Sequence, residues 1–333
     1  VYVRTFMDIM SDRRRSNLWI LKSDGSDHRP LTSRNENHRT PRCTPDGRRL
    51  LYISGEEDSP QIYCRWMHTV QAARLSRLQN SPSGIAWSPD GKHIAFSMLV
   101  PAPSGDFALM PAKPKGAEWA KPAVVIRKLR YRSDGAGYLK DGYSHLFVLS
   151  AEGGTPRQIT SGDFHHRGPR WTPDGRSLVF SANRYEDWEY EPRNSEIYEV
   201  DVSSRRIKAL TNREGPDTNP AISPDGQKIA YLGYDDRYQG YQVTHLFLMS
   251  RDGSGKRILT ADFDRDVRNP NWSGDGGGLF FQYDDFGNTK IAFVNLDGRV
   301  ETLAGDLGGM SLGRPYSAGT YSVAENGTYA FTL

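Results

Sequence analysis

Apolar and polar residues alternate along much of this chain in short runs that end at a recurring polar turn. The runs "HIAFSM" (93–98) and "SLVFSA" (177–182) show the pattern clearly. Alternation with a period of two residues is typical of a β-strand that buries one face. The pattern therefore predicts an all-β protein built from short strands, and long helices are not expected.

The recurring turn reads Ser/Thr-Pro-Asp-Gly and lies between two such runs. Proline presets φ near −65°, the aspartate side chain bonds nearby backbone, and glycine permits a positive φ, so the chain reverses there. Hairpins with this turn occupy 41–54, 85–98, 169–182, 220–233 and 270–283, and a weaker copy occupies 321–333. Their turn glycines are spaced 44, 84, 51, 50 and 51 residues apart. Apart from the doubled interval, this is roughly the period of a propeller blade.

A second repeated phrase follows each hairpin and completes a four-stranded unit. It occurs at 17–25, 61–67, 144–154, 196–204, 244–253 and 290–298, and it leads into a short run such as "HRPLTS" (28–33). Antiparallel four-stranded units at this period predict a β-propeller, in which the blades cover each other's faces. Trp87, Trp171 and Trp272 recur at one point of the first strand and are expected to fill the space between blades.

The two ends of the chain supply incomplete repeats around five complete ones. Residues 1–33 contain the last three strands of a repeat, and 321–333 contain the first two. Joined into one closing blade, these halves would give six blades, whereas a longer parent chain would give seven. The additional strand at 1–7 favours seven. We expect residues 1–333 to form a single propeller domain.

The doubled interval indicates an insertion at about 101–143 in the third blade. Its first part is rich in Pro, Gly and Ala, and "AVVIRKLRYRSDGAGYL" (123–139) predicts an extra hairpin. Loops of this length within a compact fold are usually functional or disordered. The insertion is therefore the segment that we expect to contact another domain.

Composition narrows the classes of partner. The 333 residues include 43 basic and 40 acidic side chains, a net charge of +3, and no basic block beyond "DRRRS" (12–16), which argues against nucleic acid. No run approaches the roughly 18 apolar residues of a membrane helix. The opening residues lack the pattern of a signal peptide. We therefore expect a soluble protein without a membrane partner, in the cytoplasm or the periplasm.

The two cysteines are not expected to form a disulfide. Cys43 occupies the position of the recurring tryptophans, where a small buried side chain with a free thiol is expected. Cys64 lies on a third strand, which does not neighbour the first strand of a blade.

Two motifs imitate catalytic or metal sites. "GMSLG" (309–313), centred on Ser311, matches a nucleophile elbow, but no helix is predicted after it to expose the hydroxyl. Asp262, Asp264 and Asp266 are spaced as in a calcium loop, yet the required glycine and glutamate are replaced by Val267 and Ser273. We expect no catalytic residue, no metal and no cofactor in this chain.

The loops that lead into the first strands carry the best candidates for a binding site, because these strands line a propeller's channel. The candidates to face a substrate or another domain are His38, His165, His166, Arg167, Asp217 and Arg268. Solvated or locally hydrogen-bonded surface is the alternative interpretation. The aromatic and acidic segments 185–192 and 234–241 form either a docking rim or ordinary exposed hairpin ends.

The hairpins, the "xLTS" strand ends, the insertion at 124–149 and the opening "DRRRSNLWI" (12–20) resemble the N-terminal propeller of prolyl oligopeptidase family serine peptidases. Members of the acylaminoacyl peptidase and dipeptidyl peptidase type are most similar. The resemblance implies a propeller that caps a C-terminal α/β-hydrolase domain and filters peptides. It implies that domain and peptide substrates as partners, with a homo-oligomer also possible.

This chain itself contains no catalytic triad, so the implied serine peptidase is a longer parent protein. The alternative is a free-standing scaffold for protein binding that resembles TolB, which also uses blades with Pro-Asp-Gly turns. A closed six-bladed ring would favour that alternative, and the insertion in the third blade favours the peptidase.

Overall fold

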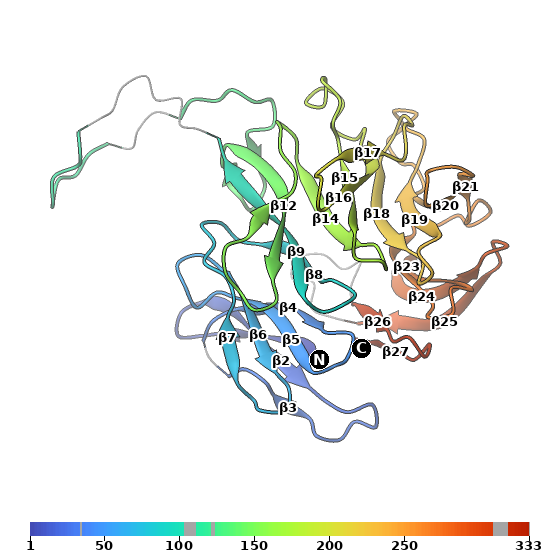
Figure 1. The fold of residues 1–333 in the computed structure, drawn as a ribbon, viewed down its shortest axis with the longest axis horizontal. Helices are drawn as coiled ribbons and strands as arrows, with labels where there is room; N and C mark the ends of the chain where they lie inside the picture. Colours follow the sequence, from blue (N-terminus) through green and yellow to red (C-terminus); the bar gives the residue numbers. More distant parts are fainter. Residues whose placement is uncertain (34, 103–110, 121–123, 309–318, 333) are drawn as a thin grey trace.

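The chain folds as an all-β propeller in which every sheet is antiparallel (Figure 1). The computed structural model describes residues 1–33, 35–102, 111–120, 124–308 and 319–332. The segment 309–313 with Ser311 lies outside the described residues. In the part that is described, no helix is long and apolar enough to cross a membrane.

Six blades follow one another along the chain. The first has three strands, β1 (Tyr2–Asp8), β2 (Arg13–Ile20) and β3 (Arg29–Pro30). The second contains β4 (His38–Cys43), β5 (Arg49–Ser54), β6 (Gln61–Trp66) and β7 (Ala72–Arg74). The third contains β8 (Ser83–Trp87), β9 (His93–Pro101), β12 (Gly142–Ser150) and β13 (Arg157–Gln158).

The fourth blade contains β14 (His166–Trp171), β15 (Ser177–Ala182), β16 (Glu196–Asp201) and β17 (Ile207–Ala209). The fifth contains β18 (Asp217–Ile222), β19 (Lys228–Gly233), β20 (His245–Ser250) and β21 (Arg257–Ile258). The sixth contains β22 (Arg268–Trp272), β23 (Gly278–Asp285), β24 (Asn288–Asn295) and β25 (Val300–Leu307). A separate two-stranded sheet, β26 (Tyr321–Val323) and β27 (Tyr329–Phe331), follows them.

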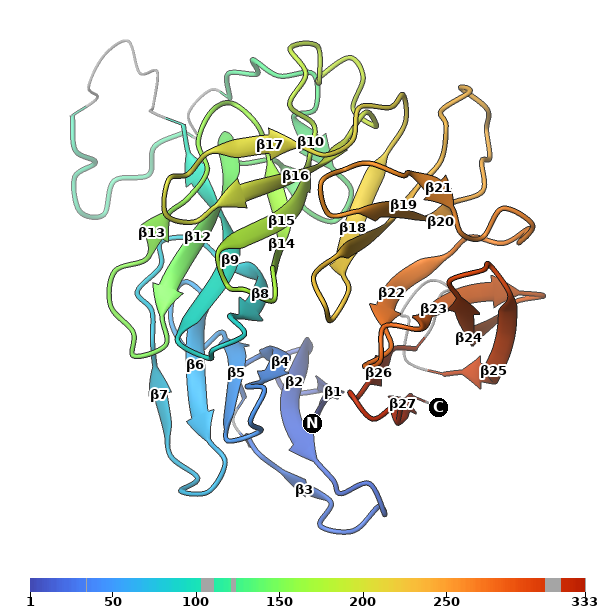
Figure 2. The ribbon, with the colours of Figure 1, turned by 45° about the vertical axis from the view of Figure 1, so that its right-hand side comes forward.

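This arrangement confirms the predicted propeller, with five complete four-stranded blades flanked by partial sheets. The blades radiate from a centre that is lined by the first strands β4, β8, β14, β18 and β22 (Figures 1 and 2). We call these five the inner strands. The number of blades in a longer parent protein stays a prediction.

The insertion separates β9 from β12 in the third blade. It contains the short strands β10 (Arg132–Ser133) and β11 (Gly137–Tyr138), which pair with each other where the extra hairpin was expected. Its described residues 111–120 extend away from the blades (Figure 1).

The core consists of layers that neighbouring blades form together. Ile53 and Ile62 of the second blade pack with Phe96 and Phe147 of the third, and similar clusters lie between each later pair of four-stranded blades. Each fully buried side chain of this size contributes about 1.5 to 3 kcal/mol. Because one blade leaves both faces uncovered, the repetition of blades is what creates the core.

The recurring turn owes its shape to the side chains that the motif specifies. In the second blade the Thr44 hydroxyl donates to Asp46 Oδ1 at 2.5 Å, and that oxygen also accepts from the Arg48 amide at 3.0 Å. The same bonds recur in the next four blades. All six turn glycines have positive φ, between 65° and 81°. The predicted reversal is confirmed at every copy.

The sixth blade departs from the turn motif for a steric reason. It has Gly274 where the other full blades have proline. A Cβ atom on Gly274 would lie 2.0 Å from the backbone oxygen of Glu325, in the β26–β27 hairpin. The glycine therefore permits this hairpin to pack against the sixth blade.

The recurring tryptophans lie between blades, as predicted, and also form hydrogen bonds there. The Trp87 indole donates to the carbonyl of Arg42 in the preceding blade at 3.1 Å. The Trp171 indole donates to the Ala86 carbonyl at 3.3 Å, and the Trp272 indole to the Ala221 carbonyl at 2.9 Å. These bonds fix the inner strands of adjacent blades relative to each other.

The cysteines bear out one expectation and contradict another. Both are free, and Cys64 is buried, which raises the pKa of its thiol to about 11. The expected burial of Cys43 is wrong, because this side chain is exposed. The first blade has three strands and no inner strand. Among the described residues, that blade therefore offers no inner strand to cover Cys43 as the preceding inner strand covers each tryptophan.

Candidate functional site at the channel mouth

Each inner strand carries a bulge at the same position. Its pairing with the second strand shifts register in all five blades, and a residue of positive φ marks the shift. These residues are Thr40, Gly84, Gly168, Asn219 and Asn269. Without a bulge, residues three apart would lie on opposite faces of a strand. The additional residue restores them to one face.

The bulge creates two tiers of residues along the centre of the propeller, which we call the channel wall. The first tier lies just before the bulge and consists of Arg39, Ser83, Arg167, Thr218 and Arg268. The second tier lies two residues after it and consists of Arg42, Ala86, Arg170, Ala221 and Asn271. None of these ten side chains is buried.

The channel wall carries positive charge without acidic residues of its own. Five of its ten residues are arginines. Arg268 pairs with Asp284. Desolvation by the surrounding protein, and then the charge of Arg42, lowers the pKa of Arg170.

The sequence-predicted candidates divide between the channel wall and the interior of the blades. Arg167 and Arg268 belong to the first tier. His38, His166 and Asp217 occupy the position one residue earlier on their strands and are 1%, 0% and 0% exposed. They are therefore enclosed by neighbouring side chains and do not face the solvent of the channel.

His165 is half-buried beside the third blade. Its Nδ1 accepts a hydrogen bond from the Ser144 amide at 3.1 Å, and its ring packs on Tyr143 at 5.4 Å and on Trp188 at 6.0 Å. Trp188 belongs to the predicted rim segment 185–192, which thus contacts a candidate residue.

His166 belongs to a buried chain of polar groups that sequence reasoning missed. Its Nε2 lies 2.6 Å from Arg184 Nη1, and its Nδ1 lies 3.3 Å from Nδ1 of the buried His145. Because a guanidinium only donates, Nε2 of His166 must accept. The neutral ring then carries its proton on Nδ1 and donates to His145, an assignment inferred from the hydrogen-bond network.

The surroundings of these histidines hold them in the neutral form. Burial, and then the charge of Arg184, lowers the pKa of His166 to about 3. Burial, and then Arg167, lowers the pKa of His165 to about 4. The site therefore offers neutral imidazoles beside guanidinium groups at physiological pH.

This arrangement predicts that the protein loses stability in mild acid. In the unfolded chain a histidine binds a proton below about pH 6.5, whereas folded His166 stays neutral until far lower pH. The free energy of unfolding is therefore expected to fall as pH drops below 6.5, by about 1.4 kcal/mol per pH unit for each such histidine. Urea unfolding at pH 6.5, 6.0, 5.5 and 5.0 measures this slope.

The variant His166→Gln should reduce the slope, while His68→Gln serves as the control because His68 is exposed. Equal slopes in the two variants would contradict the assignment of His166 as a neutral buried group.

Asp217 anchors a second cluster that sequence reasoning found only in part. Arg213 binds Asp217 through Nη2 and, at 3.1 Å, through Nε, while its Nη1 donates to Asp235 at 2.7 Å. The guanidinium also lies 4.2 Å above the ring of Phe247. The nearby carboxylate of Glu196, in the fourth blade, accepts from the Tyr185 hydroxyl at 2.8 Å. In each of these two buried carboxylates, one oxygen is thus held by a specific partner.

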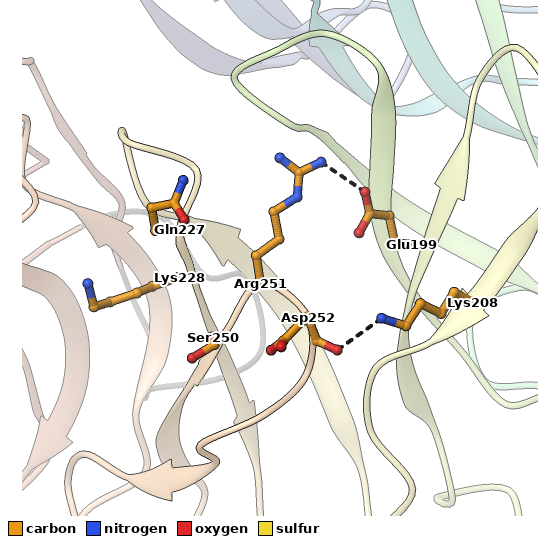
Figure 3. A pocket seen from close by; sticks show the side chains of 7 residues that line it. All are labelled: Glu199, Lys208, Gln227, Lys228, Ser250, Arg251 and Asp252. Atoms are coloured by element: carbon orange, nitrogen blue, oxygen red, sulfur yellow. Dashed lines mark hydrogen bonds and ion pairs between the residues drawn. The ribbon is translucent and has the colours of Figure 1, made fainter.

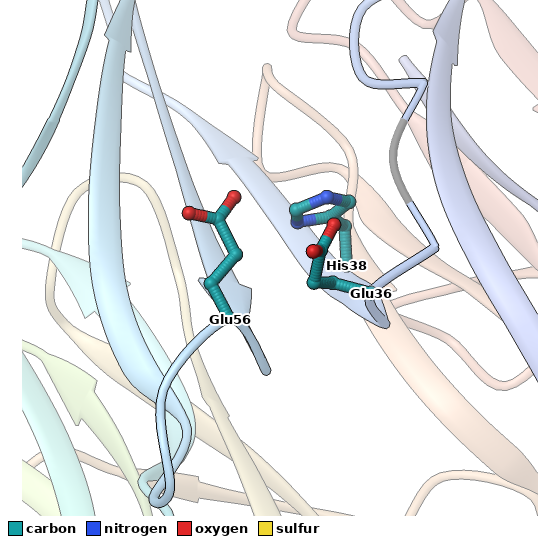
Figure 4. Close-up of side chains that lie close together, drawn as sticks. All are labelled: Glu36, His38 and Glu56. Carbon is teal, nitrogen blue, oxygen red and sulfur yellow. The ribbon is translucent and has the colours of Figure 1, made fainter.

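One group of side chains has the donor types of a metal site. Glu36, His38 and Glu56 bring two carboxylate oxygens and one imidazole nitrogen within 4.8 Å of one another (Figure 4). Donors of this kind could hold a divalent cation such as Zn²⁺. The His38 ring also packs edge-on against Tyr52 at 5.5 Å, so it contributes to the blade itself.

A recess between the fourth and fifth blades is lined by charged side chains (Figure 3). Arg251 of the fifth blade binds Glu199 at 3.0 Å and Asp174 at 3.2 Å, both in the fourth. Lys208 donates to the backbone oxygen of Asp252 at 3.0 Å. These contacts connect the two blades, so we assign the charged side chains of the recess to the packing of one blade against the other.

Comparison with known proteins relates this chain to two kinds of protein. The family model described as TolB beta propeller domain matches residues 136–311. An uncharacterized peptidase of Bacillus subtilis, YuxL, is 32% identical over 183 residues, which cover 55% of this chain and 27% of YuxL. Dipeptidyl-peptidase 5 of Porphyromonas gingivalis is 25% identical over 297 residues, covering 84% of this chain and 42% of that protein.

The Tol-Pal system protein TolB of Francisella tularensis is 25% identical over 248 residues, covering 70% of this chain and 54% of TolB. An acylaminoacyl peptidase of Pyrococcus horikoshii has a similar fold, with a TM-score of 0.68 at 17% identity over 91% of this chain and 44% of the peptidase. The chain thus spans about a quarter to a half of the length of these curated relatives.

Proposed function

This chain belongs to the TolB beta propeller domain family, and on that premise we propose that it is the non-catalytic propeller of a serine peptidase. In this role it gates and orients peptide substrates for an α/β-hydrolase domain of the same protein. The observation that carries the proposal is the relationship to dipeptidyl-peptidase 5, which includes 84% of this chain but only 42% of that protein.

The channel wall supports the gating role. Eight of its ten side chains are polar or charged, and none of the ten is buried, as a path for peptides requires. The tryptophan hydrogen bonds connect β4 with β8, β8 with β14, and β18 with β22, and they restrain the strands that line this path. We expect such a path to admit extended peptides and to exclude folded proteins.

The insertion supports a contact with the hydrolase domain. Its described part exposes a group of apolar side chains, of which Val125 is 71%, Val124 62% and Leu129 57% exposed. Exposed apolar patches on soluble proteins commonly mark interaction sites. We assign this surface to the interface with the hydrolase domain.

The proposal predicts where hydrolytic activity resides. The 333-residue chain should not hydrolyse aminoacyl or acyl-aminoacyl reporter peptides, and Ser311→Ala should change nothing. The full gene product should hydrolyse short peptides, with kcat/KM falling steeply for longer peptides and for folded proteins. Hydrolysis by the 333-residue chain that is lost in Ser311→Ala would contradict the proposal, as would equal rates on short peptides and folded proteins.

A second function, a scaffold for protein binding, is favoured by the relationship to TolB, which includes 70% of this chain. The two functions differ in one measurable respect. A gene product without peptidase activity on any length of peptide would favour the scaffold.

A further inference from the structure

Four arginines of the channel wall form no ion pair with any described residue. They are Arg39 and Arg42 on β4, and Arg167 and Arg170 on β14. Two of them donate hydrogen bonds to neutral oxygens: Arg39 to the Ser81 hydroxyl at 2.7 Å, and Arg42 to the Pro41 carbonyl at 2.9 Å. Several guanidinium donors therefore remain available in this part of the channel.

The fold brings these arginines to one side of the channel. β4 and β14 flank β8, whose residue in the second tier is the small Ala86. Arg42 and Arg170 thus stand on the strands to either side of Ala86, whose small side chain leaves room between them. The Trp87 indole is bonded to the Arg42 carbonyl, and the Trp171 indole to the Ala86 carbonyl. The backbone that carries the second tier is therefore held in place.

An unpaired cluster of this kind opposes folding. Like charges repel each other at short range. Arg213 and Arg251, by contrast, are each paired with carboxylates. Residues that break such a local rule without a structural gain are expected at functional sites. The cluster therefore indicates a ligand of opposite charge.

We propose that Arg39, Arg42, Arg167 and Arg170 form a binding site for the carboxylate groups of a peptide inside the channel. Guanidinium groups bind carboxylates through two parallel hydrogen bonds, and these bonds are stronger where water is partly excluded. The second tier, Arg42 and Arg170, holds the carboxylate, and the first tier attracts it at the mouth. The choice of a peptide as the ligand rests on the proposed function, whereas the preference for an anion rests on the arginines alone.

Fluorescence anisotropy of the 333-residue chain tests this site without any hydrolase. The probes are rhodamine-labelled pentaglutamate with an amidated C-terminus and the matching pentaglutamine. The glutamate peptide is expected to bind at least tenfold more tightly in 50 mM salt and to lose that advantage in 500 mM salt. The variant Arg42→Gln/Arg170→Gln should weaken its binding about tenfold or more.

The matched control is Arg48→Gln/Arg176→Gln, which removes the same charge from the exposed turns of the same two blades. It should bind the glutamate peptide within about twofold of the unmodified chain, because its charges lie outside the channel. The channel variant should also melt at the same or a higher temperature than the unmodified chain, since removing the repulsion favours folding. Equal binding by the two variants would overturn the proposal.

Competition identifies the source of the carboxylate. The competitors are unlabelled pentaglutamine peptides with a free or an amidated C-terminus. If only the peptide with the free C-terminus competes, the site binds peptide C-termini as well as acidic side chains. Competition by the amidated glutamate peptide alone assigns it to side chains. Binding of inorganic phosphate without binding of either peptide would contradict a peptide site. Because no hydrolysis is measured, a failure here is distinct from a failure of the peptidase assignment.

Discussion

Replacing Asp217 with alanine is expected to lower the free energy of unfolding by about 3 to 5 kcal/mol. The carboxylate is fully buried and binds Arg213 through two guanidinium nitrogens. Its removal leaves a guanidinium over the Phe247 ring without its buried partner. The loss is larger than for an exposed pair because the remaining charge is surrounded by protein. Urea unfolding at pH 7.5 measures it.

Asp235→Ala is the matched control for this prediction. Asp235 binds the same guanidinium at 2.7 Å, but its side chain is 63% exposed. An exposed partner contributes about 0 to 1 kcal/mol, so this variant should remain close to the unmodified protein. If the two substitutions lower stability equally, burial is not what makes the Asp217 pair important.

The second large effect is expected for Gly233→Ala at the end of β19. A Cβ atom there would lie 2.2 Å from Arg213 Nη2, 2.3 Å from the Pro216 oxygen and 2.7 Å from Asp217 Oδ1. The added methyl group must displace the guanidinium from Asp217, which leaves the buried carboxylate unpaired. We therefore expect a loss similar to that of Asp217→Ala, about 3 to 5 kcal/mol.

Gly240→Ala is the control, because nothing lies within 4 Å of a Cβ atom at that position. The double variant Gly233→Ala/Asp217→Ala adds a further test, since both changes break the same pair. Its loss should be much smaller than the sum of the two single losses. Fully additive losses would show that Gly233 acts through another contact.

The fold was predictable because its signals are local in the sequence. The turn is specified by a threonine or serine, an aspartate and a glycine within four residues, and the observed bonds involve only these residues and the one that follows them. Strand alternation is likewise repeated in each full blade, and a tryptophan recurs at one position in three of the five, as Trp87, Trp171 and Trp272. A signal that recurs five times identifies the architecture even where a single copy would be ambiguous.

The channel wall was predicted only in part because the bulge changes the alternation. Arg167 and Arg268 were recognised from the loops that precede them, whereas Arg39, Arg42 and Arg170 were missed. Simple alternation places Arg39 and Arg42 on opposite faces. The sequence does contain a signal for the bulge, because the bulge residue is followed by proline in "TP" (40–41), "GP" (168–169) and "NP" (219–220).

The hydrogen-bond partners of the buried candidate His166 could not be predicted from the residues next to it in the sequence. His145 lies 21 residues before His166, on β12 of the third blade. Arg184 lies 18 residues after His166, beyond β15 of the fourth blade. Such contacts depend on how strands pair in space. The same limit explains Cys43, whose exposure follows from the missing inner strand of the first blade.

The central claim is that this propeller serves a peptidase, and the coding sequence beyond Leu333 tests it most directly. The account predicts a strand, a Gly-x-Ser-x-Gly elbow and a helix, followed by aspartate and histidine in that order. A stop codon soon after Leu333, in a gene with no hydrolase segment, would contradict it and would favour the protein-binding scaffold.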